Sequence, residues 1–554
     1  MPERSYRRQL TPALVSSWAE LRQSWPRDLL AGLTVAIVAL PLAMALAIAS
    51  GATPDKGLLT AVVAGFLIST LGGSRVQIGG PTGAFIPVVF LVIQQHGYDG
   101  LILATLLAGV ILILAGLLRV GALMRYMPRP VITGFTAGIA VIIFCSQLKD
   151  FFGLQTGALP AEFLPRMAGL LAAAPSWQPL TVGLGLAALV LIVLLRRHAP
   201  RWPAFLLAVL LLTLLNPFLP TPAETLGQRF GEIRFALPAP HWPAVSLARL
   251  VELLPAALTI AFLAGIESLL SAVVADGMTG GRHRPNAELL AQGVANGASA
   301  LFGGLPATGA IARTATNVRA GALTPLAGIV HAVFVLAAML LLGPWLAHVP
   351  LVALAAVLVI VAWNMSEHEH FRHLLRAPLG DRIILLLSFG LTVLVDLTVA
   401  IQTGLVVAAF VFMHRMAQTV EVAAHGDEDD PDLAAIAADQ RERLPPGVEA
   451  FRVRGPLFFG ATSSLEEVPR QFMQPPRVFI LRMGQVPLID ASGAHALAGF
   501  LEHWARLDTP VIISGLRPDL RRMLARLGIV ETPERLHFVA DFEAALRLAD
   551  ESMQ

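Results

Sequence analysis

The 554-residue sequence predicts a polytopic α-helical membrane protein, with fourteen transmembrane segments in a seven-plus-seven inverted repeat, followed by a small cytoplasmic α/β domain. Three observations indicate this fold class. Hydrophobic residues make up 55% of the chain and charged residues 14%, which is too little polar surface for one soluble globule. Many apolar runs have about 17 to 25 residues, the length that crosses a bilayer. A Gly-Gly element that leads to Thr-Gly-Ala also occurs twice, at 79–84 and 303–310.

These two repeated elements interrupt apolar segments with glycine and proline, which break helices. Within lipid, such a break is tolerated only where protein or a water-filled cavity satisfies the freed backbone groups. Paired breaks in two halves of a chain are typical of a transport site near the middle of the membrane. The pattern therefore predicts both the duplication and the position of the site.

Composition and motifs exclude several other classes. The net charge of +2 predicts no nucleic-acid partner, and the lone Cys145 lies in an apolar run, so no intrachain disulfide is possible. The sequence lacks the Gly-x-x-x-x-Gly-Lys-Ser/Thr loop of nucleotide-driven pumps. The first apolar run has no small-residue cleavage site, so we expect it to stay as a span. We expect neither an enzyme nor a bound metal or cofactor.

The predicted spans follow the apolar runs in chain order, and the two short ones begin at the repeated break. They are 28–50, 57–73, 82–96, 99–119, 130–148, 179–197, 202–218, 251–276, 286–302, 308–320, 323–344, 350–364, 382–398 and 399–415. An odd number of spans in each repeat inverts the second copy. The predicted domains are a cytoplasmic N-terminus at 1–27, a transporter domain at 28–418 with repeats at about 28–220 and 245–418, a charged linker at 419–447, and a soluble domain at 448–554.

Basic residues in the short loops predict the orientation, because such residues favour the cytoplasmic side. In the fourteen-span arrangement, the arginines of six short loops fall on one side, and the opposite short loops hold only Lys56. The arginines are Arg75, Arg119, Arg125, Arg129, Arg196, Arg197, Arg201, Arg282, Arg284, Arg319, Arg372, Arg376 and Arg382. Both termini are therefore predicted to be cytoplasmic.

The chain after Arg415 has the composition of a charged linker and then of a soluble domain. Runs rich in β-forming residues at 448–453, 478–483 and 511–515 alternate with helical patterns at 462–473, 493–506 and 518–527, which predicts an α/β fold. Ser492 stands where the second of these helices begins. We expect it to cap that helix, and a phosphate acceptor is the alternative.

Two charged residues in apolar segments are the main candidates for function. Glu267 lies near the middle of span 251–276, and Ser271 follows one turn later on the same face. Arg313 follows the second break and is the one arginine predicted deep within a span. A central charge costs about 3 kcal/mol on insertion scales, so such residues usually face a cavity or a partner. We interpret Glu267 as a proton or substrate site and Arg313 as an anion contact. A structural Glu267 and a neutralising Glu267–Arg313 pair are the alternatives.

The two breaks also begin short helices, whose first N–H groups are unpaired and carry about half a positive charge. Two such ends that face each other would form an anion site, with glycine allowing close backbone approach. The candidate residues at the two ends are Thr82, Gly83, Ala84, Phe85, Thr308, Gly309 and Ala310. Tight helix packing is the alternative role for these glycines. We expect Asp396 to cap or gate its span and His331 to be packed in the interior.

Several motifs resemble the sulfate permease family, also called solute carrier family 26. They are Pro128–Gly138 with Ser146–Asp150, Gly73–Pro81, Val274–Asp276 and Val395–Leu397 in the membrane part, and Gly455–Ala461, Leu481–Met483 and Ile489–Gly493 in a tail that is similar to a STAS domain. The resemblance implies a fourteen-helix inverted repeat with core and gate domains. It also implies an anion site between the third and tenth segments, a cytoplasmic STAS domain, and commonly a homodimer.

The chain departs from the family pattern at positions that concern the substrate. Leu42 and Leu46 replace the polar Gln and Tyr that many members carry in the first helix, which predicts a less polar pocket. Sodium-coupled bicarbonate members carry Asp at the position of Glu267 and Thr at the position of Ile311. Two expected oxygen ligands for sodium are therefore altered or missing in this chain. Burial disfavours the charged form of a carboxyl group, so a buried Glu267 can take up a proton, and the differences favour protons over sodium.

The sequence therefore predicts a secondary transporter of small anions in the bacterial inner membrane, in which Glu267 couples transport to protons. Dicarboxylate or bicarbonate are the favoured substrates. A sodium-coupled or exchange-type sulfate or bicarbonate carrier, an anion channel or sensor, and a nucleobase permease on the same core remain as alternatives. The expected partners are the anion, the proton, the lipid bilayer and a second copy of the chain.

Overall fold

The computed structural model describes residues 10–122, 127–157, 159–160, 162–199, 202–231, 233, 235–424, 444–460 and 462–553. The chain divides into two compact units, Met1–Val406 and Val407–Gln554, and the division falls within the last apolar helix. Each unit is described by itself.

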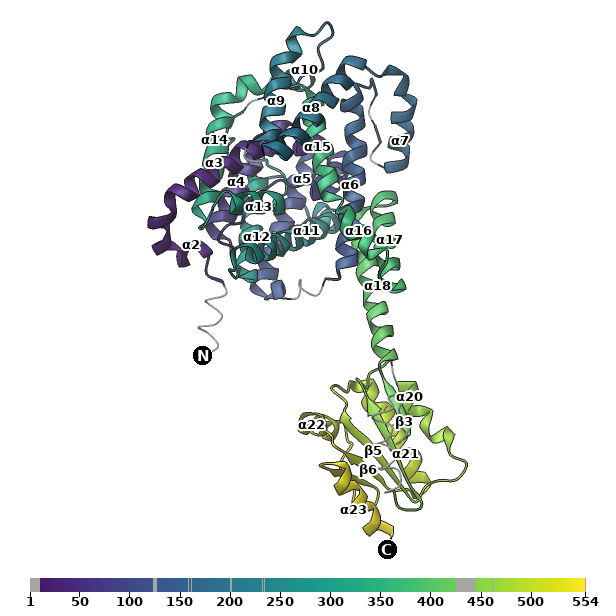
Figure 1. Ribbon diagram of the computed structural model, residues 1–554. Helices are drawn as coiled ribbons and strands as arrows, with labels where there is room; N and C mark the ends of the chain where they lie inside the picture. Colours follow the sequence, from purple (N-terminus) through teal and green to yellow (C-terminus); the bar gives the residue numbers. More distant parts are fainter. Residues whose placement is uncertain are drawn as a thin grey trace. The chain divides into compact units, whose positions relative to one another are not determined.

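The first unit is helical (Figure 1). Its two halves repeat one order of elements: two long helices, a two-residue strand, a short helix, and then further long helices. The first half contains α2 (Ala13–Ser16), α3 (Trp18–Ala49), α4 (Pro54–Leu71), β1 (Gly79–Gly80), η1 (Gly83–Phe85), α5 (Ile86–Leu117), η2 (Val120–Ala122), α6 (Arg129–Phe152), α7 (Phe163–Ala172), η4 (Ala174–Ser176), α8 (Pro179–His198), α9 (Ala204–Leu215), η5 (Asn216–Phe218) and α10 (Leu226–Phe230). The second half contains α11 (Leu247–Thr279), α12 (Pro285–Leu301), β2 (Thr308–Gly309), α13 (Ile311–Arg319), α14 (Leu326–Leu346), α15 (Leu351–Met365), α16 (His368–Leu374), α17 (Leu379–Leu394) and α18 (Leu397–Gln418).

Each predicted span overlaps a helix of this unit, but span 308–320 begins on β2, and span 382–398 runs past the end of α17 into the start of α18. Spans 82–96 and 99–119 share the single element η1–α5, which bends at Gly97, where φ is 71°. Within the described residues, nine helices are long and apolar enough to cross a membrane. The count of fourteen crossings agrees with this arrangement and stays a prediction.

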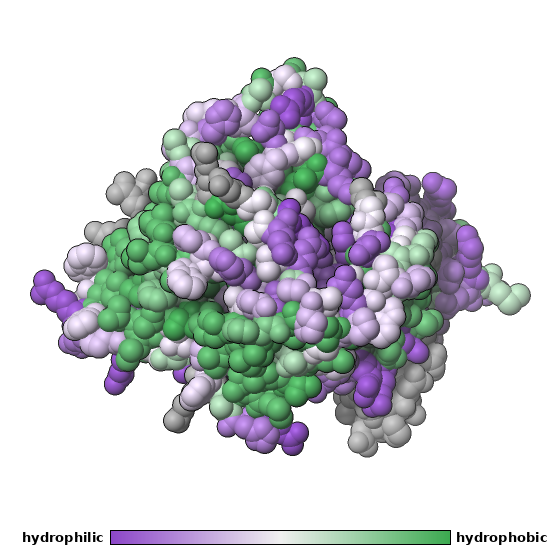
Figure 2. Space-filling view, turned by 90° about the horizontal axis from the view of Figure 1, so that it is seen from above, coloured by the Kyte–Doolittle hydropathy of each residue, from purple (hydrophilic) through white to green (hydrophobic). Residues whose placement is uncertain are grey.

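Glycine lets the central helices approach closely. A Cβ built on Gly109 of α5 would lie 2.7 Å from the Gly293 carbonyl oxygen of α12, and a Cβ on Gly293 would lie 2.6 Å from that of Gly109. Two helices whose backbones nearly touch gain van der Waals contact without needing a hydrophobic driving force, which lipid does not supply. In the view of Figure 2, hydrophobic side chains cover large areas beside a central group of hydrophilic ones. Such apolar flanks are typical of a surface that faces lipid.

The two breaks pair with each other. β1 and β2 form an antiparallel pair in which Gly79 lies opposite Gly309 and Gly80 opposite Thr308. The Ala310 amide extends the pair by donating to the Ile78 carbonyl over 2.9 Å. Backbone groups that leave their helices are thus satisfied by the equivalent segment of the other half. The pairing places the start of η1 beside the start of α13.

The second unit is an α/β domain with a five-stranded sheet in the order β3-β4-β5-β6-β7. The strands from β4 to β7 are parallel, and β3 is antiparallel to β4. Its elements are β3 (Glu421–Ala424), β4 (Val448–Arg454), α20 (Thr462–Glu466), η6 (Val468–Gln471), β5 (Val478–Gln485), α21 (Ala491–Arg506), β6 (Val511–Ser514), α22 (Pro518–Arg526), β7 (Leu536–Val539) and α23 (Phe542–Met553). Phe479 of β5 stacks on Trp504 of α21 in the core, with ring centroids 5.0 Å apart.

The predicted pattern of this tail matches β4, β5 and β6, and the helices α21 and α22. The strands β3 and β7 were not expected, and β3 lies within the range predicted as linker. Residues 425–443 of that range lie outside the described residues. The domain boundaries predicted from the sequence therefore stay predictions.

Orientation can be tested with single cysteines in a Cys145→Ser background. Thr221 and Arg282 are both exposed, and the arginine-rich loops place them on opposite sides of the membrane. We expect Thr221→Cys to react with an impermeant maleimide added outside intact cells, and Arg282→Cys to react only after the cells are lysed. The reverse pattern would contradict the cytoplasmic placement of both termini.

Candidate functional site

The first break brings a hydroxyl group to the predicted acid. Thr82 immediately precedes η1, and its Oγ1 donates a hydrogen bond to Oε2 of Glu267 on α11 over 2.8 Å. Both side chains keep partial exposure, whereas Gly83, Ala84 and Phe85 are buried. Among the predicted residues, Thr82 and Glu267 are therefore the two that are not fully buried.

Arg313 approaches the same break from α13. Its side chain is 3% exposed, and an Nη2 hydrogen bond goes to the Pro81 carbonyl oxygen. Gly80 has a φ of 151°, and a Cβ at this position would collide with the Arg313 guanidinium, so only glycine leaves room here. Within the described part of the chain, Nε and Nη1 of Arg313 have no hydrogen-bond partner.

Arg313 and Glu267, whose side chains carry opposite charges, thus contact two consecutive residues of one break. Arg313 contacts Pro81 and Glu267 contacts Thr82, but the two charged groups do not pair directly. In the part of the chain that the structure describes, Glu267 and Arg313 make no ion pair, although their charges interact at longer range. A buried guanidinium without a counter-charge is costly. Neither η1 nor α13 has a side-chain cap at its start, so their first N–H groups add further positive potential. This arrangement favours an anion close to the break.

The remaining predicted residues hold the site together in this structure. The Ser271 hydroxyl donates to Thr314 Oγ1 over 3.0 Å, and the Thr308 hydroxyl donates to the Ala264 carbonyl over 2.8 Å. Both side chains are fully buried. The Ala310 amide donates its hydrogen bond to the Ile78 carbonyl beside the strand pair. A direct contact of these groups with substrate stays a prediction. The structure brings Thr82, Glu267 and Arg313 together at the break, and the other predicted residues are buried around it.

A buried polar network behind Glu267 was not predicted. Glu288 of α12 is fully buried, and its Oε1 accepts hydrogen bonds from Ser268 Oγ at 2.7 Å and Gln292 Nε2 at 2.9 Å. Its Oε2 accepts from the Gly73 and Ser74 amides, at 2.9 and 3.3 Å. The network fixes the loop before β1 to α12. The signal was present in the sequence, since Glu288 and Gln292 lie four residues apart within a predicted span.

Three secondary interpretations have clear outcomes. The predicted capping role of Asp396 is confirmed, although the helix that it caps is α18 and not the span 382–398 in which it was placed: its Oδ1 accepts a hydrogen bond from the Val399 amide at 2.8 Å. His331 is fully buried, as predicted. The prediction for Ser492 is wrong. Asp490 caps α21 by accepting from the Gly493 amide at 2.7 Å, and Ser492 lies exposed in the first turn.

A separate cavity of about 400 Å³ lies where α6, α8, α10 and α15 meet, and none of the predicted site residues lines it. Arg229 of α10 spans this region, with Nη1 2.7 Å from Asp150 Oδ1 and Nε donating to Glu224 Oε1 over 3.0 Å. Burial acts to lower the Arg229 pKa, but the hydrogen bonds and charges of Glu224 and Asp150 outweigh it and raise that pKa above its usual value. The guanidinium therefore stays charged and holds α10 to the end of α6.

The comparisons with known proteins concern the family and the fold. The Sulfate permease family model matches residues 26–388, and the STAS domain model matches residues 442–545. The chain belongs to the sulfate permease family. It is 42% identical over 518 residues to the Bacillus subtilis (strain 168) protein named "Putative sulfate transporter YvdB", which covers 93% of this chain and 96% of that protein. It is also 31% identical over 524 residues to "Bicarbonate transporter BicA" of a Picosynechococcus species. That match covers 91% of this chain and 90% of that protein.

Solved structures of sulfate permease relatives share the fold. The murine Slc26a9 anion transporter in the inward-facing state gives a TM-score of 0.87 at 19% identity and covers 99% of this chain and 95% of that one. The transmembrane domain of a cyanobacterium bicarbonate transporter BicA gives a TM-score of 0.63 at 31% identity. The match covers 68% of this chain and 97% of that one. The predicted fold class, a polytopic helical membrane protein with a STAS domain, is therefore confirmed.

The packing of the second break is testable. A Cβ on Gly309 would overlap the Gln77 amide, whose Nε2 donates to Ser268 Oγ over 2.8 Å. We expect Gly309→Ala to displace Gln77 and to destabilise the fold by about 1–3 kcal/mol, the cost of leaving buried polar groups unpaired. Gly297→Ala is the matched control, since its Cβ meets no described atom within 4 Å. Equal thermal unfolding midpoints for the two variants in detergent would show that the Gln77 contact contributes little.

Proposed function

We propose that the protein is a secondary active transporter of small anions and that proton movement through Glu267 drives uptake. The observation that carries this proposal is the placement of Glu267 and Arg313 at consecutive residues of one helix break, with opposite charges that do not pair. A site with a fixed cation and a separate reachable acid can hold an anion and a proton together. An anion and a proton that move together carry a smaller net charge than the anion alone. The free-energy cost of moving them through a low-dielectric medium is therefore lower.

The substrate class follows from the charges and from the relatives. The relatives are named as sulfate or bicarbonate transporters, and both of these substrates are small oxyanions. Hydrogen-bond donors at the starts of η1 and α13 suit oxyanions. Leu42 and Leu46 are buried and apolar in α3, which adds a dicarboxylate with a short apolar centre to the candidates. We therefore propose bicarbonate or a dicarboxylate as the substrate, and sulfate as the next candidate.

Proton coupling is favoured over sodium coupling by the groups around Glu267. Its one hydrogen bond from a described side chain comes from the Thr82 hydroxyl. A sodium ion requires several oxygen ligands, and Ile311 supplies a hydrocarbon side chain at the start of α13. A single carboxylate beside a hydroxyl can take up a proton without other ligands.

Uptake by purified protein in liposomes tests this proposal. We expect saturable accumulation of labelled succinate, sulfate or bicarbonate when the outside is made acidic, and no added effect of an inward sodium gradient. Uptake by protein-free liposomes is subtracted, because acid converts part of the bicarbonate to CO2, which crosses the bilayer without a carrier. Accumulation driven by sodium alone would replace the proton with sodium in the mechanism. Flux that rises without saturation would indicate a channel, and uptake of uracil without any anion uptake would indicate a nucleobase permease.

We also propose that the transporter resides in the bacterial inner membrane as a homodimer, with both termini in the cytoplasm. The family assignment supports the membrane location, and the arginine-rich loops support the orientation. Crosslinking in native membranes would reveal the dimer.

The STAS domain is proposed to regulate or assemble the transporter rather than to bind its substrate. None of the candidate anion or proton ligands lies beyond α18. We expect a truncation after Gln418 to keep substrate affinity within about threefold of the full chain, a difference under about 0.7 kcal/mol. If the truncated protein elutes as a folded species but has lost substrate binding, the domain contributes to the site and this assignment is wrong.

A further inference from the structure

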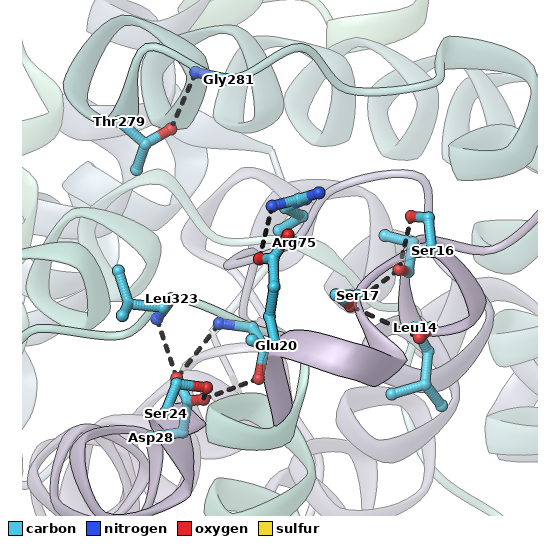
Figure 3. A network of polar contacts seen from close by, with 12 residues as sticks. Leu14, Ser16, Ser17, Glu20, Ser24, Asp28, Arg75, Thr279, Gly281 and Leu323 are labelled. Carbon is cyan, nitrogen blue, oxygen red and sulfur yellow. Dashed lines mark hydrogen bonds and ion pairs between the residues drawn. The ribbon is translucent and has the colours of Figure 1, made fainter. Parts of the chain in front are cut away.

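The first turns of α3 bury polar residues and expose two tryptophans. The face that packs on the protein carries polar residues, since Ser17, Ser24 and Asp28 are buried. Figure 3 shows their contacts: Ser24 Oγ donates to Asp28 Oδ2 over 2.7 Å, and the Leu323 amide donates to Asp28 Oδ1 over 2.8 Å. The Thr324 hydroxyl also donates to Asp28 Oδ2, over 2.6 Å. Asp28 thereby fixes this part of α3 to the connection between α13 and α14.

The exposed side of the same turns carries an aromatic stripe, beside the exposed polar residues Glu20, Gln23 and Arg27. Trp18 is 67% exposed, Trp25 55% and Leu29 44%. These residues recur at the helical spacing i, i+7 and i+11, so they form one stripe, and the exposed Arg22 at i+4 lies within it. Two exposed tryptophans on one stripe are unusual for a helix side that faces only water. Trp is enriched at membrane–water interfaces because its ring is apolar at one end and polar at the other.

The length of α3 leaves these turns outside the hydrocarbon core. The helix has 32 residues, and about 20 suffice to cross a bilayer. If the span ends near Ala49, the residues from Trp18 to about Leu29 lie at the level of the headgroups. This end of the helix is on the side predicted to be cytoplasmic, where the leaflet carries anionic lipids.

Arg22 has the chemistry to recognise such a lipid. Within the described part of the chain it makes no hydrogen bond or ion pair, whereas nearby Arg75 is already paired with Glu20 at 2.9 Å. A guanidinium binds a phosphate group with paired hydrogen bonds, and a long side chain can extend from an apolar stripe to the headgroups. We propose that Trp18, Arg22 and Trp25 form a seat for one anionic phospholipid, with the acyl chain along the tryptophans and the phosphate at Arg22.

Tryptophan quenching by brominated lipids tests this seat in the full-length protein. Vesicles would contain phosphatidylcholine and phosphatidylglycerol, with bromine carried on the acyl chains of only one of the two at equal bromine content. For the wild-type protein we expect brominated phosphatidylglycerol to quench more strongly than brominated phosphatidylcholine, because the anionic lipid occupies the seat preferentially. Equal quenching by the two lipids would overturn the proposal.

Two variants and a control make the result specific. Arg22→Gln should remove the excess quenching by phosphatidylglycerol. So should the double variant Trp18→Phe with Trp25→Phe, which removes the two of the chain's eight tryptophans that lie at the seat. Arg27→Gln is the matched control, since Arg27 is exposed on the same helix but faces away from the stripe, and it should keep the excess. An excess that persists in Arg22→Gln, or in the double variant, places the anionic lipid elsewhere and overturns the assignment.

Discussion

Replacing Glu267 with Gln should abolish proton-driven accumulation while leaving anion binding largely intact. Gln keeps the size of the side chain and can still accept a hydrogen bond from the Thr82 hydroxyl, which lies 2.8 Å from Glu267 Oε2. It cannot take up or release a proton at any working pH. We therefore expect uptake that no longer responds to an imposed pH gradient, and substrate affinity within about threefold of the wild type, or about 0.7 kcal/mol.

The measurement pairs uptake with binding at two pH values. Glu252→Gln is the matched control, since Glu252 lies on the same helix, α11, but is exposed and close to His96, and it should keep the pH response. If Glu267→Gln still accumulates substrate along a proton gradient as the wild type does, Glu267 is structural. The coupling acid would then have to be sought elsewhere, and the buried Glu288 would be the next candidate.

The site was predictable from the sequence to the extent that its signals are local. Glycine and proline in an apolar run are enough to locate a break, and a charge in such a run is enough to single out Glu267 and Arg313. The contacts that these residues make are not local. Thr82 and Glu267 lie 185 residues apart in the chain, and Arg313 and Pro81 lie 232 apart. No spacing rule connects such positions, because their approach depends on how the two halves pack.

The same distinction explains what was missed in the second unit. β4, β5 and β6 have apolar patterns that indicate buried strands, and they were predicted. β3 and β7 have four residues each and form the two edges of the sheet, where a strand needs fewer apolar residues. The error at Ser492 was of another kind. Asp490 and Ser492 are both good capping residues two positions apart, and the helix start decides between them.

Replacing Arg313 with Ala should weaken anion binding itself. The side chain is the buried cation at the break, and its Nε and Nη1 groups are free of protein partners within the described residues. A hydrogen bond to a charged group contributes about 1.5–3 kcal/mol, so we expect affinity to fall by more than about tenfold. The loss should be similar at both pH values, because a guanidinium stays protonated throughout the working range.

Two further variants separate the charge of Arg313 from its structural contact with the Pro81 carbonyl. Arg313→Lys keeps a positive charge and a donor, so it should recover part of the affinity that Arg313→Ala loses. Arg319→Ala removes an exposed arginine from the same helix, α13, and should bind substrate normally. If Arg313→Ala is folded and binds as tightly as the wild type, the guanidinium is not an anion contact. The two helix starts at η1 and α13 would then hold the anion alone, through backbone N–H groups that no side-chain substitution removes.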